Sequence, residues 1–188
     1  MKLNKLYDYP KSTRSIVEGK RHYDIREEKL PSVTTILSAC QSEEKRVSLE
    51  AWRQRVGPKT ADLAKDLAAE RGTLMHRYLE AYIDGSGHKD MTPLGEQAEK
   101  MAKQIIESGL RDLGEVWGTE VTLYYPGLYA GQTDVVGIYN GRESIIDFKQ
   151  TNKPKQREWI DDYFTQLAAY AIAHNYVYNT QIQSGVMV

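Results

Sequence analysis

An Asn-Gly pair constrains the folding of this chain more than any other feature of its sequence. Asn140 and Gly141 stand between two strand-like runs in GQTDVVGIYNGRESIIDFKQ, residues 131–150. Both residues tolerate the positive φ angles that the central positions of a two-residue hairpin turn require. A turn at this pair fixes the register of the two strands, and that register places Asp134 directly opposite Asp147.

Two carboxylates that face each other on one side of a sheet repel, because their Cβ atoms are only about 5 Å apart. Lys149 joins the same face as Asp147, since side chains alternate along a strand. An isolated Asp-x-Lys triplet is more often a solvated surface with its acid pointing to water. Here the flanking runs DVVGIY and SIIDFK are apolar on both faces, which favours strands buried on both sides within an α/β layer. A buried pair of acids requires a cation.

Length and composition indicate one soluble domain. The 188 residues are 40% hydrophobic and 27% charged, and no apolar run is long enough to span a membrane. The opening stretch MKLNKLYDYPKSTRSIV has no apolar core of the secretory type. A single cysteine, Cys40, excludes a disulfide framework and a four-cysteine metal cluster. These features suit a reducing cytoplasm.

The charges are distributed unevenly although the net charge is only −1. Residues 1–60 carry 13 basic and 8 acidic groups, whereas residues 61–188 carry 12 and 18. Such asymmetry is often without consequence, but it would suit a polyanion guided by one basic surface to a metal-binding pocket on another. We expect a single domain, with residues 1–60 as a basic, helical N-terminal extension and residues 61–188 as the core.

Helical periodicity dominates the first two thirds of the chain. The opening stretch reads as a loop followed by a short strand at KRHYDI, and LPSVTTIL then leads into a helical region that Gly57-Pro58 interrupts. From Thr60 to Gly85 apolar residues recur at helical spacing. They are Leu63, Leu67, Leu74, Tyr78 and Ala81. The stretch TPLGEQAEKMAKQIIESG repeats the pattern and ends at Gly109.

Strands dominate the remainder. EVWGTEVTLYYP precedes the hairpin, the basic loop QTNKPKQR follows it, and a last helix is expected over EWIDDYFTQLAAYAIAHNYVYN before a final strand at QIQSGVMV. Helices, then a sheet, then a helix and a strand predict an α/β fold with mixed strand directions, in which a central sheet is flanked by helices.

Several polar residues lie on helices or strands that could face the two carboxylates. On the helix over 60–85, His76 and Glu80 share one face, and Gly72 leaves room for close approach. Gln166 and Tyr170 form a comparable pair in the last helix, and Glu120 lies in the strand before the hairpin. A lone helical histidine is more often a structural group than a ligand, so only the company of these residues makes them candidates.

Taken in chain order, the motifs LPSVTTIL, RGTLMHRYLE, Gly131-x-x-Asp134, Asp147-Phe148-Lys149 and QLAAY resemble the PD-(D/E)xK nuclease superfamily. Within it, the chain is similar to the RecB-type exonuclease branch, and more narrowly to phage-type and mitochondrial genome maintenance exonucleases. The resemblance covers roughly residues 20–175. The proline of the superfamily name and the cysteines of iron–sulfur members are missing, and the second acid is an aspartate.

The resemblance implies a restriction-endonuclease-like core and a role for each matching residue. Asp134, Asp147 and the Phe148 carbonyl would bind Mg²⁺ or Mn²⁺, because hard oxygen ligands select these ions. Lys149 would orient or deprotonate the attacking water. The remaining residues have these implied roles: His76 binds metal or the scissile phosphate, Glu80 and Glu120 support a second ion or Lys149, and Gln166 and Tyr170 hold Lys149 or the nucleic-acid backbone.

Other residues are candidates for phosphate contacts. Lys153, Lys155 and Arg157 lie in the basic loop that follows the metal strand, although a solvated loop is an equally reasonable interpretation. Ser32 and Thr34 could bind phosphate through their hydroxyls, but capping of the helix that follows them is the simpler role.

The first hypothesis is therefore a divalent-metal-dependent DNA exonuclease that acts on single-stranded or frayed ends. Two alternatives are a structure-selective or restriction-like endonuclease of the same superfamily and a non-catalytic nucleic-acid-binding module. A metal-stabilised scaffold without a DNA role is a third. The resemblance further suggests the cytoplasm of a bacterial or phage-infected cell and a recombination partner protein.

Overall fold

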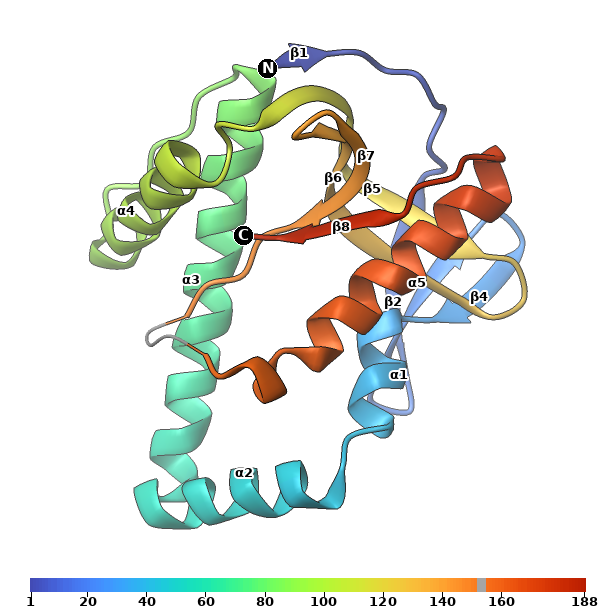
Figure 1. Cartoon of the computed structure of the whole chain (residues 1–188). Helices are drawn as coiled ribbons and strands as arrows, with labels where there is room; N and C mark the ends of the chain where they lie inside the picture. Colours follow the sequence, from blue (N-terminus) through green and yellow to red (C-terminus); the bar gives the residue numbers. More distant parts are fainter. Residues whose placement is uncertain (152–154) are drawn as a thin grey trace.

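A five-stranded mixed sheet with the order β1-β5-β6-β7-β8 forms the centre of the structure, a computed structural model that describes residues 1–151 and 155–188 (Figure 1). Its strands are β1 (Lys2–Leu3), β5 (Leu113–Tyr125), β6 (Tyr129–Tyr139), β7 (Arg142–Asp147) and β8 (Ser184–Met187). Neighbours β5, β6 and β7 are antiparallel, whereas β1 and β8 run parallel to the strands beside them. The predicted α/β class with a mixed central sheet is confirmed, and the architecture is consistent with a restriction-endonuclease-like core.

The hairpin between β6 and β7 has the predicted turn and register. Asn140 and Gly141 have φ angles of 48° and 74°, which is the left-handed region that a tight hairpin turn requires. Tyr139 pairs with Arg142, as the turn demands. The apolar runs on both strands are buried on both faces. Val135, Val136, Ile145 and Ile146 are all 0% exposed.

Helices cover both faces of the sheet (Figure 1). On one face α3 (Pro58–Asp84) and α4 (Pro93–Ser108) pack against the strands through a core that includes Met75, Leu79 and Ala102. On the other face α5 (Asp161–Tyr178) and the short α1 (Val33–Ala39) close a second core around Leu167 and Ala173. A 3₁₀ turn (Arg157–Trp159) precedes α5. The central sheet therefore lies between two helical layers, with one core on each of its faces.

The N-terminal part contains a small antiparallel sheet in addition to the expected helices. It consists of β2 (Ser12–Val17), β3 (Lys20–Ile25) and β4 (Glu28–Pro31) in sequence order. The strand predicted at KRHYDI is β3, but the prediction of a loop for the opening stretch was wrong, because that stretch includes β2. Four of the six β2 residues are exposed, so no alternation of apolar and polar residues marks the strand.

The helix α2 (Glu43–Val56) and the first half of α3 extend away from the sheets as an arm. No residue of α2 is buried. Leu63 and Leu67, which fit the apolar periodicity of the predicted helix, are 59% and 47% exposed. Their spacing predicts the helix correctly, but they stay exposed because the 27-residue α3 is longer than the sheet it covers.

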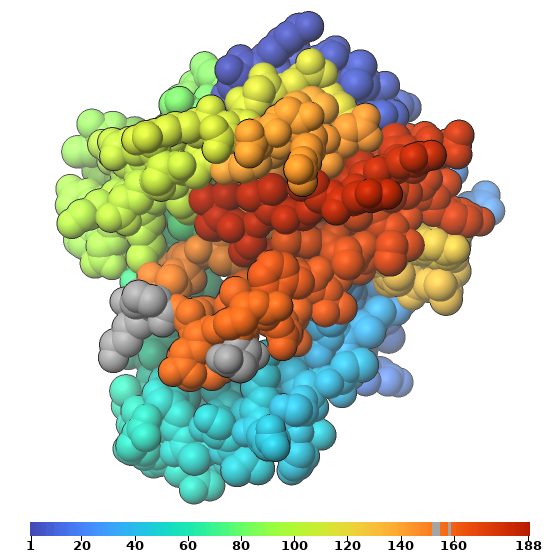
Figure 2. All heavy atoms as spheres, in the orientation of Figure 1, coloured from blue at the N-terminus to red at the C-terminus, as the bar shows by residue number. Residues whose placement is uncertain are grey.

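An ion pair between Lys45 of α2 and Asp162 of α5 connects the arm to the body. Figure 2 shows the same arrangement in space-filling form, with α2 below the orange start of α5. Within the part of the chain that the structure describes, no helix combines the length and apolar character that a membrane crossing requires.

Candidate metal-dependent active site

Three neighbouring strands each contribute one carboxylate to a row across the sheet. In the β5–β6 register Thr119 pairs with Val135, so the adjoining residues Glu120 and Asp134 face each other. The hairpin register, continued one pair beyond its last ladder pair, brings Asp147 of β7 to the other side of Asp134. Three adjacent acids repel one another, so groups of positive charge have to compensate for them.

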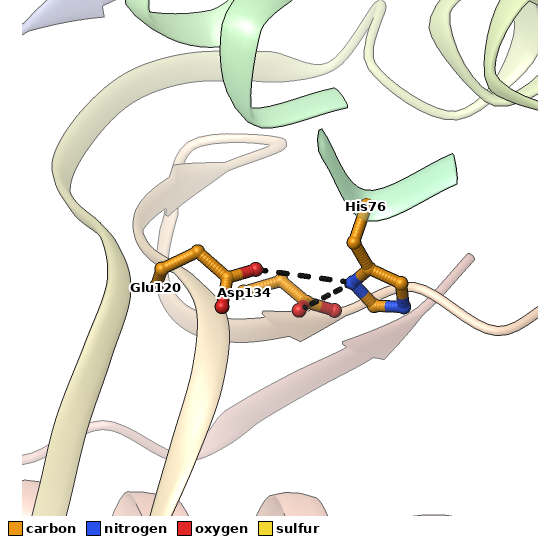
Figure 3. Close-up of side chains that lie close together, drawn as sticks. All are labelled: His76, Glu120 and Asp134. Carbon is orange, nitrogen blue, oxygen red and sulfur yellow. Dashed lines mark hydrogen bonds and ion pairs between the residues drawn. The ribbon is translucent and has the colours of Figure 1, made fainter. Parts of the chain in front are cut away.

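A histidine from α3 supplies part of this compensation (Figure 3). His76 Nδ1 lies 2.8 Å from Asp134 Oδ1 and 3.9 Å from Glu120 Oε1. The backbone N–H of Phe148 donates to the other oxygen of Asp134, Oδ2, at 2.5 Å. Asp134 is therefore held from the helical layer on one side and from the neighbouring strand on the other.

His76, Glu120 and Asp134 form a group that fits a divalent cation. One ligand atom from each residue lies within 4.8 Å of the other two. Two carboxylate oxygens and one imidazole nitrogen are ligands that divalent first-row metals accept, and the carboxylates suit Mg²⁺ and Mn²⁺. Glu120, expected only in a supporting role, is thus a central member of the group.

Asp147 is more deeply buried than the group of His76, Glu120 and Asp134, and it pairs with Lys149. Its residue is 2% exposed, and its Oδ2 accepts a charge-assisted hydrogen bond from Lys149 Nζ. Burial, followed by the charge of Asp134, raises the pKa of Asp147 to about 6 in spite of this lysine. The Lys149 amine also lies 5.9 Å from the ring centre of Tyr163 on α5. The acid, the lysine and Asp134 all line one cleft, as the hairpin register predicts.

The crowding of acids shifts the ionisation of the neighbouring groups. Burial, with the charge of Asp134, raises the pKa of Glu120 to about 7. Burial alone would lower the pKa of His76, but its hydrogen bond to Asp134 and the two acidic charges outweigh burial and raise it. A protonated His76 beside Asp134 therefore offsets part of the repulsion among the three carboxylates. A bound dication would offset more of it.

A cleft of about 700 Å³ brings most of the predicted residues together. Those that line it are Ser32, Thr34, His76, Glu80, Glu120, Asp134, Asp147, Phe148, Lys149, Gln166 and Tyr170. Ser32 also caps α1, since its hydroxyl oxygen accepts from the backbone N–H of Thr35 at 3.1 Å, as the capping interpretation predicts.

The pair on α5 is buried at the back of the cleft. Gln166 and Tyr170 are 6% and 2% exposed, and Gln166 Nε2 donates to the Tyr170 hydroxyl at 3.2 Å. Burial, with the charge of Asp147, raises the pKa of Tyr170, so its hydroxyl keeps its proton. A Cβ at Gly131 would lie 2.5 Å from the Tyr170 ring, which explains the glycine three residues before Asp134.

The basic loop contributes less to the cleft than expected. Lys155 and Arg157 do not line it. Lys155 donates to the Tyr163 hydroxyl, and Arg157 forms an ion pair with Asp161. Lys153 lies outside the described residues. Phosphate binding by these residues stays a prediction.

Two residues that the sequence analysis missed, Gln132 of β6 and Arg14 of β2, connect Glu120 to the N-terminal sheet. Gln132 Nε2 donates to Glu120 Oε2 at 2.7 Å, and Arg14 of β2 donates to Gln132 Oε1. Gln132 could have been found, because it lies two residues before Asp134 and so on the same face of β6. Arg14 had no local signal. Together with Arg21 it forms a basic part of the cleft wall.

Comparison with curated proteins agrees with the geometry of the cleft. The chain is 32% identical to mitochondrial genome maintenance exonuclease 1 of Xenopus tropicalis over 170 residues, covering 85% of this chain and 48% of that protein. It is 29% identical to the Mus musculus protein of the same name over 191 residues, covering 90% and 55%. These relatives support an exonuclease family.

The Homo sapiens protein of that name gives a similar match, 28% identity over 176 residues, with 85% of this chain and 48% of the relative covered. No family model matches the chain. The chain thus spans about half the length of the curated relatives it matches.

Proposed function

We propose that the chain is a divalent-metal-dependent DNA exonuclease of the PD-(D/E)xK type, which acts on single-stranded or frayed DNA ends. The observation that carries the proposal is the cation-sized group of His76, Glu120 and Asp134 beside the Asp147–Lys149 pair, all on one cleft. The names of the relatives support an exonuclease, and the basic residues Arg14 and Arg21 on the cleft wall suit a polyanionic substrate.

His76, Glu120 and Asp134 would hold Mg²⁺ or Mn²⁺, with Asp147 and the Phe148 carbonyl as the further ligands that the sequence pattern implies. When bound, such an ion polarises the phosphodiester and makes water acidic enough to attack near neutral pH. The ligands bind it most tightly when they have lost their protons. The raised pKa of Glu120 means that a cation has to displace a proton from this group near neutral pH, so its binding should strengthen as the pH rises.

Lys149 has a defined role in this proposal. Asp147 holds the amine at the cleft, where it can position the attacking water and neutralise charge that develops on the phosphate oxygens. Gln166 and Tyr170 keep the neighbouring surface polar and in place, since each is buried and they bond to each other. Hydrolysis then needs no covalent enzyme intermediate.

End-labelled linear DNA and a closed single-stranded circle together test the proposal. The purified protein should shorten single-stranded linear DNA in Mg²⁺ or Mn²⁺, leave the circle intact, and stop when EDTA removes the ion. Cleaved circles would favour the endonuclease alternative, and binding without turnover would favour the non-catalytic module. Labels at the 5′ and 3′ ends report the polarity of digestion in the same experiment. A recombination partner and a bacterial or phage-infected cytoplasm remain predictions.

A bound cation should stabilise the fold through the acidic group. At a hundredfold excess over its Kd, a ligand that binds only the folded state adds about 2.7 kcal/mol to the free energy of unfolding. Thermal unfolding with and without Mn²⁺ measures this gain. Asp134→Asn should remove the gain, while the exposed acid substitution Glu96→Gln should keep it. An undiminished response in Asp134→Asn would place the cation elsewhere.

A further inference from the structure

Gln150, directly after Lys149, joins the catalytic strand to helix α3. Arg71 Nε donates to Gln150 Oε1 at 2.7 Å. Gln150 Nε2 in turn donates to the backbone carbonyl oxygen of Ala68. Both partners belong to the helix that carries His76, so one side chain connects the lysine of the cleft to the layer that supplies the histidine.

Gly72 provides the space for this connection. A Cβ at this position would lie 2.9 Å from Gln150 Nε2 and 3.7 Å from its Cδ. The sequence predicts room for close approach at Gly72, and the group that approaches is the amide of Gln150. The proposed chemistry does not use Arg71 and Gly72 of the RGTLMHRYLE motif. Both accommodate the Gln150 side chain, Arg71 by a hydrogen bond and Gly72 by leaving space for it.

Lys149 needs such a connection because it lies beyond the last residue of β7, which ends at Asp147. On the side of the sheet edge, the backbone N–H of Lys149 donates to the Val188 carbonyl at 2.9 Å. On the side of the helix, Gln150 holds the chain through its contacts with Arg71 and Ala68. A lysine amine sits on a flexible four-carbon stem, so its position depends on where its backbone is held.

We propose that Gln150 is a positioning residue, which sets the place of the Lys149 amine relative to the group of His76, Glu120 and Asp134 by fixing the strand end on α3 at Gly72. This inference rests on the proposed nuclease function. A misplacement of about 1 Å at a reacting group can cost about a hundredfold in rate, so loss of the contact acts on the chemical step and not on the binding of DNA.

Gly72→Ala and Gln150→Ala break the same contact from opposite sides, so a double-mutant cycle tests the proposal. Each should lower kcat for single-stranded DNA by about tenfold and leave KM unchanged, as a modest displacement of the amine predicts. The double variant should lose the same tenfold, because the second change has nothing left to break. Gln104→Ala, on the exposed face of α4, is the matched control and should keep full activity.

The unfolding midpoint distinguishes a loss of kcat through misplacement of the amine from a loss through damage to the fold. Alanine favours a helix more than glycine does, and the atom it would meet is the end of a flexible side chain, so Gly72→Ala should not lower the unfolding midpoint. A hundredfold loss in the double variant, a rise in KM alone, or full activity of Gly72→Ala would overturn the proposal.

Urea unfolding of the wild type, the two single variants and the double variant tests the contact independently of activity. Non-additive midpoints support the link between Gly72 and Gln150, and additive midpoints overturn it even if the wild-type protein is an active nuclease. A wild-type protein that degrades no DNA would instead count against the proposed function, and the unfolding cycle would still decide whether the contact exists.

Discussion

Lys149→Ala is expected to lower the rate of DNA hydrolysis by about 10²–10⁴-fold, the usual contribution of a positioned proton-transfer group. The lysine side chain is 30% exposed and its amine is bonded to a carboxylate that is almost completely buried. Among the described residues, Lys149 is the one lysine that lines the cleft, so none of these residues offers a second amine there. In the proposed mechanism, removal of the amine takes away both the group that positions water and the charge that neutralises the phosphate oxygens.

Folding should survive this substitution. Without its lysine, Asp147 is buried beside Asp134, so its pKa, already raised, rises further and its neutral form is favoured, which spares the fold an unpaired buried charge. Lys103→Ala is the matched control, because the exposed Lys103 of α4 pairs with Glu99 and does not line the cleft. Initial rates on labelled single-stranded DNA, with DNA affinity measured in parallel, check the prediction. A Lys149→Ala protein within threefold of the wild-type rate would contradict it.

A second large effect is expected at a histidine that does not line the cleft. His174 of α5 is 0% exposed. Its Nδ1 lies 2.8 Å from the Thr180 hydroxyl, which itself donates to Asn175 Oδ1, so Nδ1 carries the proton. Its Nε2 accepts from the Tyr9 hydroxyl at 3.1 Å. The neutral ring thus joins the N-terminal segment to the end of α5.

Burial lowers the pKa of His174 from 6.5 to about 4, because a charged ring would lose its hydration. Between these two pH values the unfolded chain binds more protons than the folded protein does, so stability rises with pH in this window. Acidification from pH 6.5 to pH 4 should therefore cost about 3 kcal/mol through this residue. Below pH 4 the loss should level off.

Glu120 and Asp147 oppose this loss of stability in acid. Their pKa values are raised in the folded protein, so acidification stabilises the fold through these two residues. The comparison therefore uses the difference between the wild type and His174→Gln, in which these other groups cancel. Urea unfolding at pH 7 and pH 5 should show the advantage of the wild type shrinking by about 2 kcal/mol. A constant difference for His174→Gln would exclude the buried neutral histidine.

Local chemistry explains why some parts of the site could be predicted. The Asn140-Gly141 turn determines the β6–β7 register from two residues, and that register places Asp134, Asp147 and Lys149 on one side of the sheet. Helical spacing likewise indicates that His76 and Glu80 share a face of α3, and both line the cleft.

Other parts had no local signal. The row of acids becomes three because β5 pairs with β6 through a register that includes two irregularities, and no short motif encodes these. Arg14 reaches Glu120 through Gln132 from an exposed strand whose sequence reads as a loop. Leu63 and Leu67 are exposed although they follow the apolar periodicity of α3. This periodicity predicts the helix, but it does not show how much of the helix packs against the sheet.

By itself, the sequence determined the hairpin, the main helices and the pairing of two acids with a lysine, because turns and periodic patterns act over a few neighbouring residues. Only the tertiary structure decided that His76 meets Asp134, 58 residues away, and that Gln150 meets Arg71, 79 residues away. Such contacts depend on how the helical layer is placed on the sheet, and the packing of the whole core sets that placement.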